Sequence, residues 1–287
     1  MRRTETEAYV LTRPARRIAP LIFASPHSGS DYSPDFLGQV VLDRRSIRSS
    51  EDAFVDRLFD RAPALGAPLL AARAPRAFVD LNRAADELDP GVIDGIARAP
   101  HNPRISSGLG VIPRVVAGGR AIYRGKLKLA EAEDRIRRFW HPYHQALAAL
   151  VEETRAAFGQ AVLIDCHSMP HEAIEAHTRP GQPRPEVVLG DRYGATAGRE
   201  VVDRVEAAFA GAGLRVGRNS PFAGAYVAQA YGRPSRGVHV VQVEIDRALY
   251  MDEVRVEPLA GFEGFRELIS GVVAELVQPP GVALAAE

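Results

Sequence analysis

Apolar runs of strand length alternate along this chain with segments of helical period, and this alternation limits the choice of folds more than any other feature. The predicted strands are residues 21–25, 68–72, 77–81, 162–166, 186–189, 214–217 and 238–245. The predicted helices are residues 50–62, 128–158, 195–210 and 262–277. Strands interleaved with helices predict a three-layer α/β/α fold around a central sheet. Because 77–81 follows 68–72 closely, we expect a hairpin there and therefore a mixed sheet.

The chain is expected to form a single domain over residues 1–287, with a core at about 18–277. It contains no internal repeat and no linker that would divide it. Two stretches, residues 82–125 and 168–185, are rich in glycine or proline and fit neither period. Long loops in a compact domain are usually functional. Each follows a polar cluster at a strand end, so we expect both to be lids over a site.

Composition argues against several classes of partner. The 36 basic residues balance the 36 acidic ones and no basic run stands out, so nucleic acid is not an expected partner. No apolar stretch is long enough to span a bilayer, so no membrane partner is expected. The single cysteine, Cys166, fits a reducing cytoplasm. We therefore expect a cytoplasmic protein with a small-molecule substrate, and the oligomeric state stays open.

Three polar clusters lie where predicted core strands end. They are Ser-Pro-His-Ser-Gly at 25–29, Asp-Cys-His-Ser at 165–168 and Gln-Val-Glu at 242–244. Open α/β sheets place their ligands at the carboxyl ends of the strands. Imidazoles and a carboxylate at such positions indicate a metal hydrolase.

His27 and His167 are the candidate nitrogen ligands of that metal. Taken singly, each is more simply a hydrogen-bonded structural histidine, but two at strand ends favour a shared ion. Catalytic zinc takes three protein ligands and keeps a position for water. Asp52 or Glu51, at the start of the predicted helix after the first strand, can supply the third ligand. We therefore expect one divalent ion, with zinc as the candidate.

Glu244 is the candidate catalytic base. Amide hydrolysis needs a group that takes a proton from water and returns it to the leaving amine. The alternative for Glu244 is an ion pair with Arg247. A positive group would also stabilise the tetrahedral oxyanion, and Arg114 and Arg124 in the first predicted lid are candidates for that role in substrate binding.

Asn82 and Arg83 follow the predicted strand 77–81 and suit an anionic substrate. Arginine binds a carboxylate through a bidentate fork, and asparagine can add a neutral hydrogen bond. The alternative for Arg83 is a surface ion pair with an acidic residue of the segment 86–89.

Two tempting features favour packing over catalysis. His144 lies beside Trp140 and Tyr143 in the long predicted helix, which favours a core histidine with satisfied hydrogen bonds. Cys166 lies inside an apolar strand with its side chain opposite to that of His167, which favours an inert buried thiol.

Six motifs together carry a resemblance to a known family. They are Ser-Pro-His-Ser-Gly at 25–29, Val-Asp-Leu-Asn-Arg at 79–83, Pro-Tyr-His at 142–144, Asp-Cys-His-Ser at 165–168, Asn-Ser-Pro-Phe-Ala-Gly at 219–224 and Gly-Val-His-Val-Val-Gln-Val-Glu at 237–244. In this order, over about residues 20–251, the chain resembles the N-formylglutamate amidohydrolase family.

The resemblance implies a fold similar to that of zinc carboxypeptidases and aspartoacylases, of the phosphorylase/hydrolase-like kind. It implies removal of formyl from N-formyl-L-glutamate to give L-glutamate and formate, and a place in histidine degradation. Carried onto this sequence, it implies that zinc is bound by His27, Asp52 and His167. It likewise implies Glu244 as the base, and a substrate contacted by Asn82, Arg83 and Asn219.

Departures from the pattern keep alternatives open. The carboxypeptidase signature has a glutamate three positions after its first histidine, where this chain has Ser30. The typical deformylase has a basic residue before its next Tyr-Gly, where this chain has Gln229 and Ala230. One alternative is therefore a carboxypeptidase-like enzyme or another N-acyl amino acid hydrolase. The alternative of another class is a non-catalytic protein that binds or senses an amino acid on the same scaffold.

Overall fold

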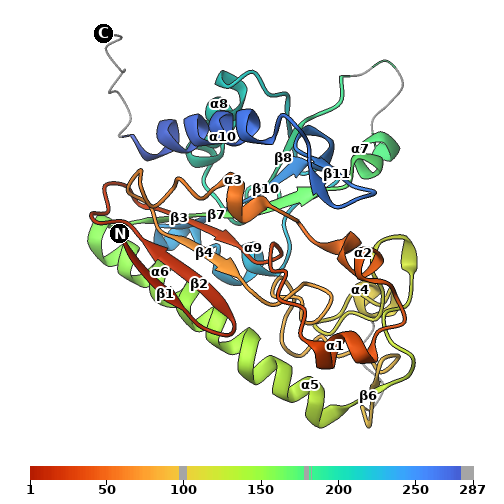
Figure 1. The fold of residues 1–287 in the computed structure, drawn as a ribbon. Helices are drawn as coiled ribbons and strands as arrows, with labels where there is room; N and C mark the ends of the chain where they lie inside the picture. Colours follow the sequence, from red (N-terminus) through yellow and green to blue (C-terminus); the bar gives the residue numbers. More distant parts are fainter. Residues whose placement is uncertain (97–101, 178–180, 182, 279–287) are drawn as a thin grey trace.

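A central mixed sheet of eight strands organises the protein (Figure 1), as seen in a computed structural model that describes residues 1–96, 102–177, 181 and 183–278. In spatial order its strands are β1 (Arg2–Glu5), β2 (Tyr9–Arg13), β4 (Leu69–Ala72), β3 (Leu21–Ser25), β7 (Ala161–Met169), β10 (Val238–Asp246), β8 (Val187–Gly190) and β9 (Val216–Arg218). The four central strands β4, β3, β7 and β10 run parallel. β2 pairs with β4 and β8 with β10 in antiparallel fashion.

Helices cover both faces of this sheet, which confirms the predicted α/β/α class. One face carries a long helix built from α5 (Leu129–Arg135), a π-helical segment (Ile136–Trp140) and α6 (His141–Phe158). The other face carries α3 (Val55–Leu58), α8 (Arg199–Gly211) and α10 (Phe262–Val277) (Figure 1). The long helix matches the prediction for 128–158, and it ends at Gly159, whose φ of 77° lies in the left-handed region that glycine tolerates.

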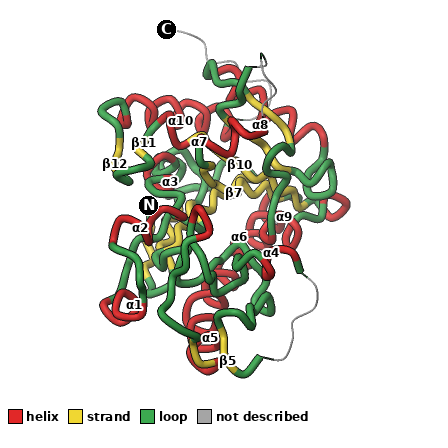
Figure 2. Tube along the Cα trace, turned by 90° about the vertical axis from the view of Figure 1, so that its right-hand side faces the viewer, coloured by secondary structure: helices red, strands yellow, loops and turns green. Residues whose placement is uncertain are grey.

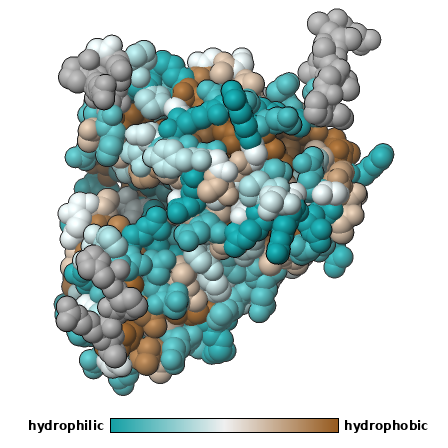
Figure 3. Space-filling view, turned by 180° about the vertical axis from the view of Figure 1, so that it is seen from behind, coloured by the Kyte–Doolittle hydropathy of each residue, from teal (hydrophilic) through white to brown (hydrophobic). Residues whose placement is uncertain are grey.

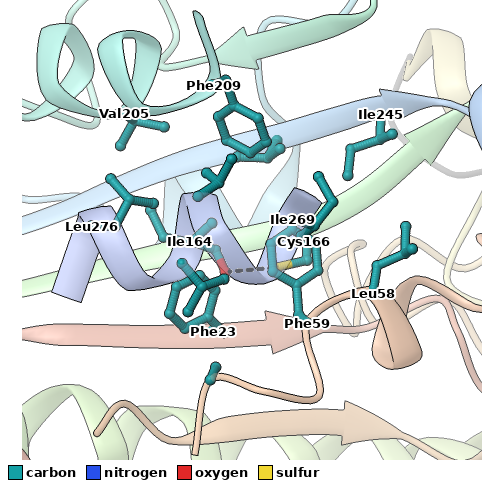
Figure 4. Packing of buried hydrophobic residues seen from close by; sticks show 14 of the residues in the cluster. Phe23, Leu58, Phe59, Ile164, Cys166, Val205, Phe209, Ile245, Ile269 and Leu276 are labelled. Atoms are coloured by element: carbon teal, nitrogen blue, oxygen red, sulfur yellow. Dashed lines mark hydrogen bonds between the residues drawn. The ribbon is translucent and has the colours of Figure 1, made fainter. Parts of the chain in front are cut away.

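The strand pleat separates the interior into two cores. In β7 and β10, alternate residues such as Ile164, Cys166 and Val243 face α3, α8 and α10, while Leu163 and Val240 face α6. Figure 4 shows Cys166 in the first of these cores with its thiol directed at the carbonyl oxygen of Ile164, 3.4 Å away. The predicted burial of Cys166 is confirmed, and burial raises the pKa of this thiol well above its usual value, which disfavours the reactive thiolate.

Short elements decorate the ends of the sheet. The helices are α1 (Pro34–Gln39), α2 (Arg44–Ile47), α4 (Pro103–Ser106), α7 (His171–His177) and α9 (Tyr226–Tyr231). Two small ladders pair β5 (Ile93–Asp94) with β6 (Leu127–Lys128) and β11 (Met251–Asp252) with β12 (Glu257–Pro258). In Figure 2, α2, α4, α7 and α9 surround the ends of β7 and β10. This rim is where the polar clusters lie.

Two predicted elements are wrong. Residues 77–81 form no strand: Phe78 and Val79 turn back to hydrogen bond with the carbonyl of Pro75, and the alternating apolar pattern reflects burial of an irregular segment. The hairpin is therefore absent, and the sheet is mixed because of β2 and β8. The predicted helix 50–62 is also broken, since Phe54 takes a left-handed φ of 66° and only Val55–Leu58 are α-helical.

The two stretches predicted to be lids include short helices and strands as well as loops. The 82–125 stretch includes β5 and α4, while β7 extends to Met169 and α7 follows it. Residues 97–101 of the first stretch and 178–180 and 182 of the second lie outside the described residues.

Hydrophilic side chains dominate the face seen from behind in Figure 3, with hydrophobic ones in patches between them. In the described part of the chain, no helix combines the length and the apolar character that crossing a bilayer requires.

Acid is expected to destabilise the fold through His144. Its imidazole is buried between the carbonyl of Leu81 and the hydroxyl of Tyr231, each 2.9 Å away, and burial lowers its pKa to about 4. The unfolded chain then binds a proton on His144 more tightly than the folded protein does. The contribution of His144 to stability is therefore fully present above pH 6.5 and is lost as the pH falls towards 4. The loss amounts to about 3 kcal/mol. Chemical denaturation across this pH range should show a flatter profile for His144→Gln, whereas the exposed His177→Gln should keep the parental slope. An unchanged slope in His144→Gln would contradict the assignment.

Candidate metal centre

The pleat of β7 and β10 brings four polar side chains to one face of the sheet. Asp165 and His167 continue the α6-facing register of β7, and Gln242 and Glu244 continue that of β10. In the parallel pairing, Glu244 lies beside His167 and Gln242 beside Asp165. His167, Gln242 and Glu244 line a pocket on this face, whereas Asp165 is fully buried against His167.

His27, Asp52 and His167 form a compact buried cluster. Their potential ligand atoms all lie within 4.8 Å of one another. Asp52 Oδ2 lies 2.8 Å from His167 Nδ1 and 3.3 Å from His27 Nδ1. The backbone amide of Asp52 donates to the carbonyl of His27, and this bond holds the two loops together.

The outer nitrogens of both imidazoles are held by buried carboxylates. His27 Nε2 lies 2.7 Å from Asp80 Oδ1, and His167 Nε2 lies 3.1 Å from Asp165 Oδ2. This is the usual outer arrangement of histidines that ligate metals, because a carboxylate on one nitrogen orients the other. Both Nδ1 atoms are thereby directed at Asp52.

The donor set fits a divalent metal. Among the described residues, His27 Nδ1 is buried with no hydrogen-bond partner of acceptable geometry, an expensive state for a polar atom that a ligand would relieve. Two imidazole nitrogens and one carboxylate oxygen are a common catalytic zinc set. Burial alone would raise the pKa of Asp52, but the hydrogen bond from His167 and the nearby imidazole of His27 hold it well below its usual value, so the carboxylate is charged and ready to ligate.

Asp52, and not Glu51, is brought to the histidines. Glu51 points the other way, where both its oxygens accept hydrogen bonds of 3.1 Å from Arg48 Nε and one also accepts from the hydroxyl of Tyr32. The second oxygen of Asp52 accepts from Arg247 at 3.0 Å.

Glu244 lies in the same pocket, and its carboxylate is oriented by a neighbour. Gln242 Nε2 donates to Glu244 Oε1 at 2.8 Å, while Gln242 Oε1 accepts from the amide of Ala225 at 2.9 Å. Glu244 makes no ion pair with Arg247, which binds Asp52 and Ser168 instead. Burial raises the pKa of Glu244 to about 7, a suitable range for an acid–base group.

The cluster forms part of the wall of a pocket of about 540 Å³, a volume typical of small-molecule sites. The 82–125 stretch supplies Arg104, Leu109 and residues 115–119 to its wall, and residues 221–225 close another side.

Asn82 and Arg83 both line this pocket but in different ways. The amide nitrogen of Asn82 lies 3.1 Å from His167 Nε2, and its oxygen accepts from the amide of Val227 at 2.7 Å. With His167 Nε2 donating to Asp165, the amide nitrogen of Asn82 instead donates to Asp165 Oδ2 at 3.4 Å, and Asn82 leaves little for a substrate. Arg83 donates only to the backbone carbonyls of Leu109 and Asn82, and among the described residues it forms no ion pair with the acidic residues at 86–89.

Three predicted substrate-binding residues are not brought to the pocket. Arg114 is paired with Asp89 at 2.8 Å, and Arg124 is exposed. Asn219 donates to Asp191 at 2.6 Å and stabilises the turn before the wall 221–225. Gln229 and Ala230, where the chain departs from the typical deformylase, do not line the pocket either.

The sequence reasoning overlooked several residues at the site. One group orients the proposed ligands and base: Asp80 contacts His27, Asp165 contacts His167, and Gln242 donates to Glu244. A second group adds positive charge to the pocket and consists of Arg76, Arg104 and Arg247. The signal for Asp165 and Gln242 was available, since each lies two residues before a candidate on the same strand. The arginines had no such signal, because distant contacts place them.

Comparison with known proteins finds one matching family and similar sequences that carry the same name as each other. The model of the N-formylglutamate amidohydrolase family matches residues 19–251. An N-formylglutamate deformylase of Pseudomonas aeruginosa is 32% identical over 264 residues, which are 90% of this chain and 91% of that protein. One of Pseudomonas putida is 28% identical over 262 residues, with the same coverage.

Solved structures agree with this result. The crystal structure of an N-formylglutamate amidohydrolase from Ralstonia eutropha JMP134 superimposes with a TM-score of 0.88 at 34% identity, over 95% of this chain and 98% of that one. A gene product of Agrobacterium tumefaciens with 21% identity and a TM-score of 0.62, over 96% of this chain and 95% of its own, shares the fold.

Proposed function

This chain belongs to the N-formylglutamate amidohydrolase family, and from that premise we propose that it hydrolyses N-formyl-L-glutamate to L-glutamate and formate. The observation that carries the proposal is the buried cluster of His27, Asp52 and His167 beside Glu244, in a chain whose curated relatives are named deformylases. A metal site with a neighbouring carboxylate base can promote the hydrolysis of such an amide.

One divalent ion, zinc, is proposed to be held by His27, Asp52 and His167. When bound, it would supply Lewis-acid activation of water and of the formyl carbonyl. Asp80 and Asp165 keep the imidazoles in place from outside, and Asn82 donates to Asp165. Arg247 neutralises the outer oxygen of Asp52, so that its inner oxygen stays directed at the histidines.

Glu244 moves the proton in this scheme. Its carboxylate accepts a proton from the attacking water and delivers it to the departing amine nitrogen, so the overall reaction consumes one water and leaves no net change on the residue. The hydrogen bond from Gln242 fixes one carboxylate oxygen and leaves the other for this transfer.

Arg76 is proposed to stabilise the oxyanion, in place of Arg114 and Arg124. It lines the pocket, its Nε donates to Asp80 at 3.0 Å, and its side chain is 24% exposed. Asp80 joins Arg76 to His27, and in the described part of the chain the terminal nitrogens of Arg76 make no other hydrogen bond. Arg247 is less suitable, since it is 5% exposed and already donates to Asp52, Ser168 and Ser49.

Arg76→Met is expected to lower kcat by about 100-fold with little change in KM, because the positive charge acts on the transition state more than on the neutral amide. Steady-state kinetics with a parallel metal analysis checks this result. Metal content should stay at the parental value, since Arg76 touches no proposed ligand directly. A higher KM with unchanged kcat would assign Arg76 to substrate binding instead.

The proposed reaction is tested by incubating metal-loaded protein with N-formyl and N-acetyl amino acids and measuring free amine. N-formylglutamate should be the best substrate. Preference for a longer acyl group would favour the alternative N-acyl amino acid hydrolase. Amino acid binding without turnover or stoichiometric metal would favour the non-catalytic alternative. Cytoplasmic location and a place in histidine degradation stay predictions.

A further inference from the structure

We infer that Arg104 binds the side-chain carboxylate of the substrate and makes the pocket selective for N-acyl amino acids with an acidic side chain. The inference rests on the proposed function, because it concerns the same pocket and names the group that distinguishes its substrate. Arg104 lies in α4, outside every motif that carried the family resemblance.

The ion pairing of the pocket sets Arg104 and Arg83 apart. Of the four arginines that line it, Arg76 is paired with Asp80 and Arg247 with Asp52. Within residues 1–96, 102–177, 181 and 183–278, Arg83 and Arg104 have no carboxylate partner. Two unpaired guanidiniums match the two carboxylates of an N-formyl dicarboxylic amino acid.

A shared loop joins the side chain of Arg83 to the backbone of Arg104, and both arginines line the pocket. Arg83 Nε donates to the carbonyl of Leu109 at 2.9 Å, and the amide of Leu109 donates to the carbonyl of Arg104 at 2.8 Å. Burial lowers the pKa of Arg83, and the nearby charges of Arg76 and Arg104 lower it further while Asp80 opposes them. Neighbouring unpaired cations repel each other, so an anion bound between them is favoured.

The order of these residues along the pocket assigns one carboxylate to each. Asn82 connects Arg83 to His167, whereas Leu109 connects Arg83 to Arg104, so Arg83 is the nearer to the metal cluster. In an N-formyl amino acid the α-carboxylate is bonded to the carbon next to the amide nitrogen, and the side-chain carboxylate lies farther out. Arg83 therefore suits the α-carboxylate and Arg104 the side-chain carboxylate.

Turnover of two isosteric substrates tests the assignment. Arg104→Gln is expected to lower kcat/KM for N-formylglutamate by roughly 10- to 100-fold, mainly through KM, because a charge-assisted hydrogen bond is lost. N-formylglutamine, which differs only by a neutral amide, should change by less than about threefold. Arg104→Lys should recover part of the loss. Arg124→Gln, an exposed arginine of the same stretch, is the matched control and should behave as the parent.

Binding separates this inference from the proposed function. Titration calorimetry of N-formylglutamate into Glu244→Gln protein, with and without Arg104→Gln, measures the same selectivity without turnover. If the parent binds the ligand and Arg104→Gln weakens it selectively, the inference stands even where the parent shows no hydrolysis. Equal losses for N-formylglutamate and N-formylglutamine, or no loss for either, would overturn it.

Discussion

Replacing Glu244 with glutamine is expected to lower kcat by two to four orders of magnitude, the usual contribution of an acid–base group. Glutamine keeps the shape of the side chain and can still bond to Gln242, but it cannot accept the proton of the attacking water. Metal content and melting temperature should match those of the parent, since Glu244 is not part of the His27, Asp52 and His167 cluster. Loss of metal in this variant would make Glu244 a ligand, and full activity would contradict the mechanism.

The pH profile supplies a second signature of Glu244. Burial raises its pKa to about 7, and a bound cation would bring that value down. The base works as the carboxylate, so kcat/KM should fall as the pH drops through this pKa, at or below pH 7. The residual activity of Glu244→Gln should lack that acidic limb, because the variant has no carboxylate there to protonate.

The sequence predicted those parts of the protein that depend on local pattern. Strands β7 and β10 have continuous apolar character, so their ends and the polar residues that follow could be located from sequence. The side chains of His167 and Glu244 then meet because parallel pairing puts them side by side. The long helix that ends at Gly159 could also be predicted, because both its apolar stripe and the glycine that ends it are local sequence signals.

Other parts depend on contacts that no local pattern reveals. The apolar alternation of 77–81 reflects burial of an irregular loop beneath Arg135, whose guanidinium lies 4.2 Å from the centre of the Phe78 ring. The choice between Glu51 and Asp52 depended on Phe54 breaking the expected helix and on the backbone bond between Asp52 and His27. Arg76 and Arg104 reach the pocket from segments with no regular period, so only the fold identifies them.

Loss of the metal cluster is the other large effect expected. His27→Ala removes one of three proposed ligands, and the protein should lose stoichiometric metal together with nearly all activity. Asp80→Asn keeps the imidazole but weakens its outer support, so metal affinity should fall by only about 10- to 100-fold. Elemental analysis after dialysis measures both outcomes directly.

A readout independent of catalysis comes from thermal unfolding. A metal that binds the folded protein and not the unfolded chain raises stability by about 2.7 kcal/mol at a free concentration 100 times its Kd. Added zinc should therefore raise the melting temperature of metal-stripped parent protein, raise that of Asp80→Asn only at higher concentration, and leave His27→Ala unchanged. His177→Ala, at an exposed histidine away from the pocket, should respond as the parent does. If His27→Ala keeps its metal and its zinc response, the cluster around Asp52 is a hydrogen-bonded structural network and the proposed metal chemistry is wrong.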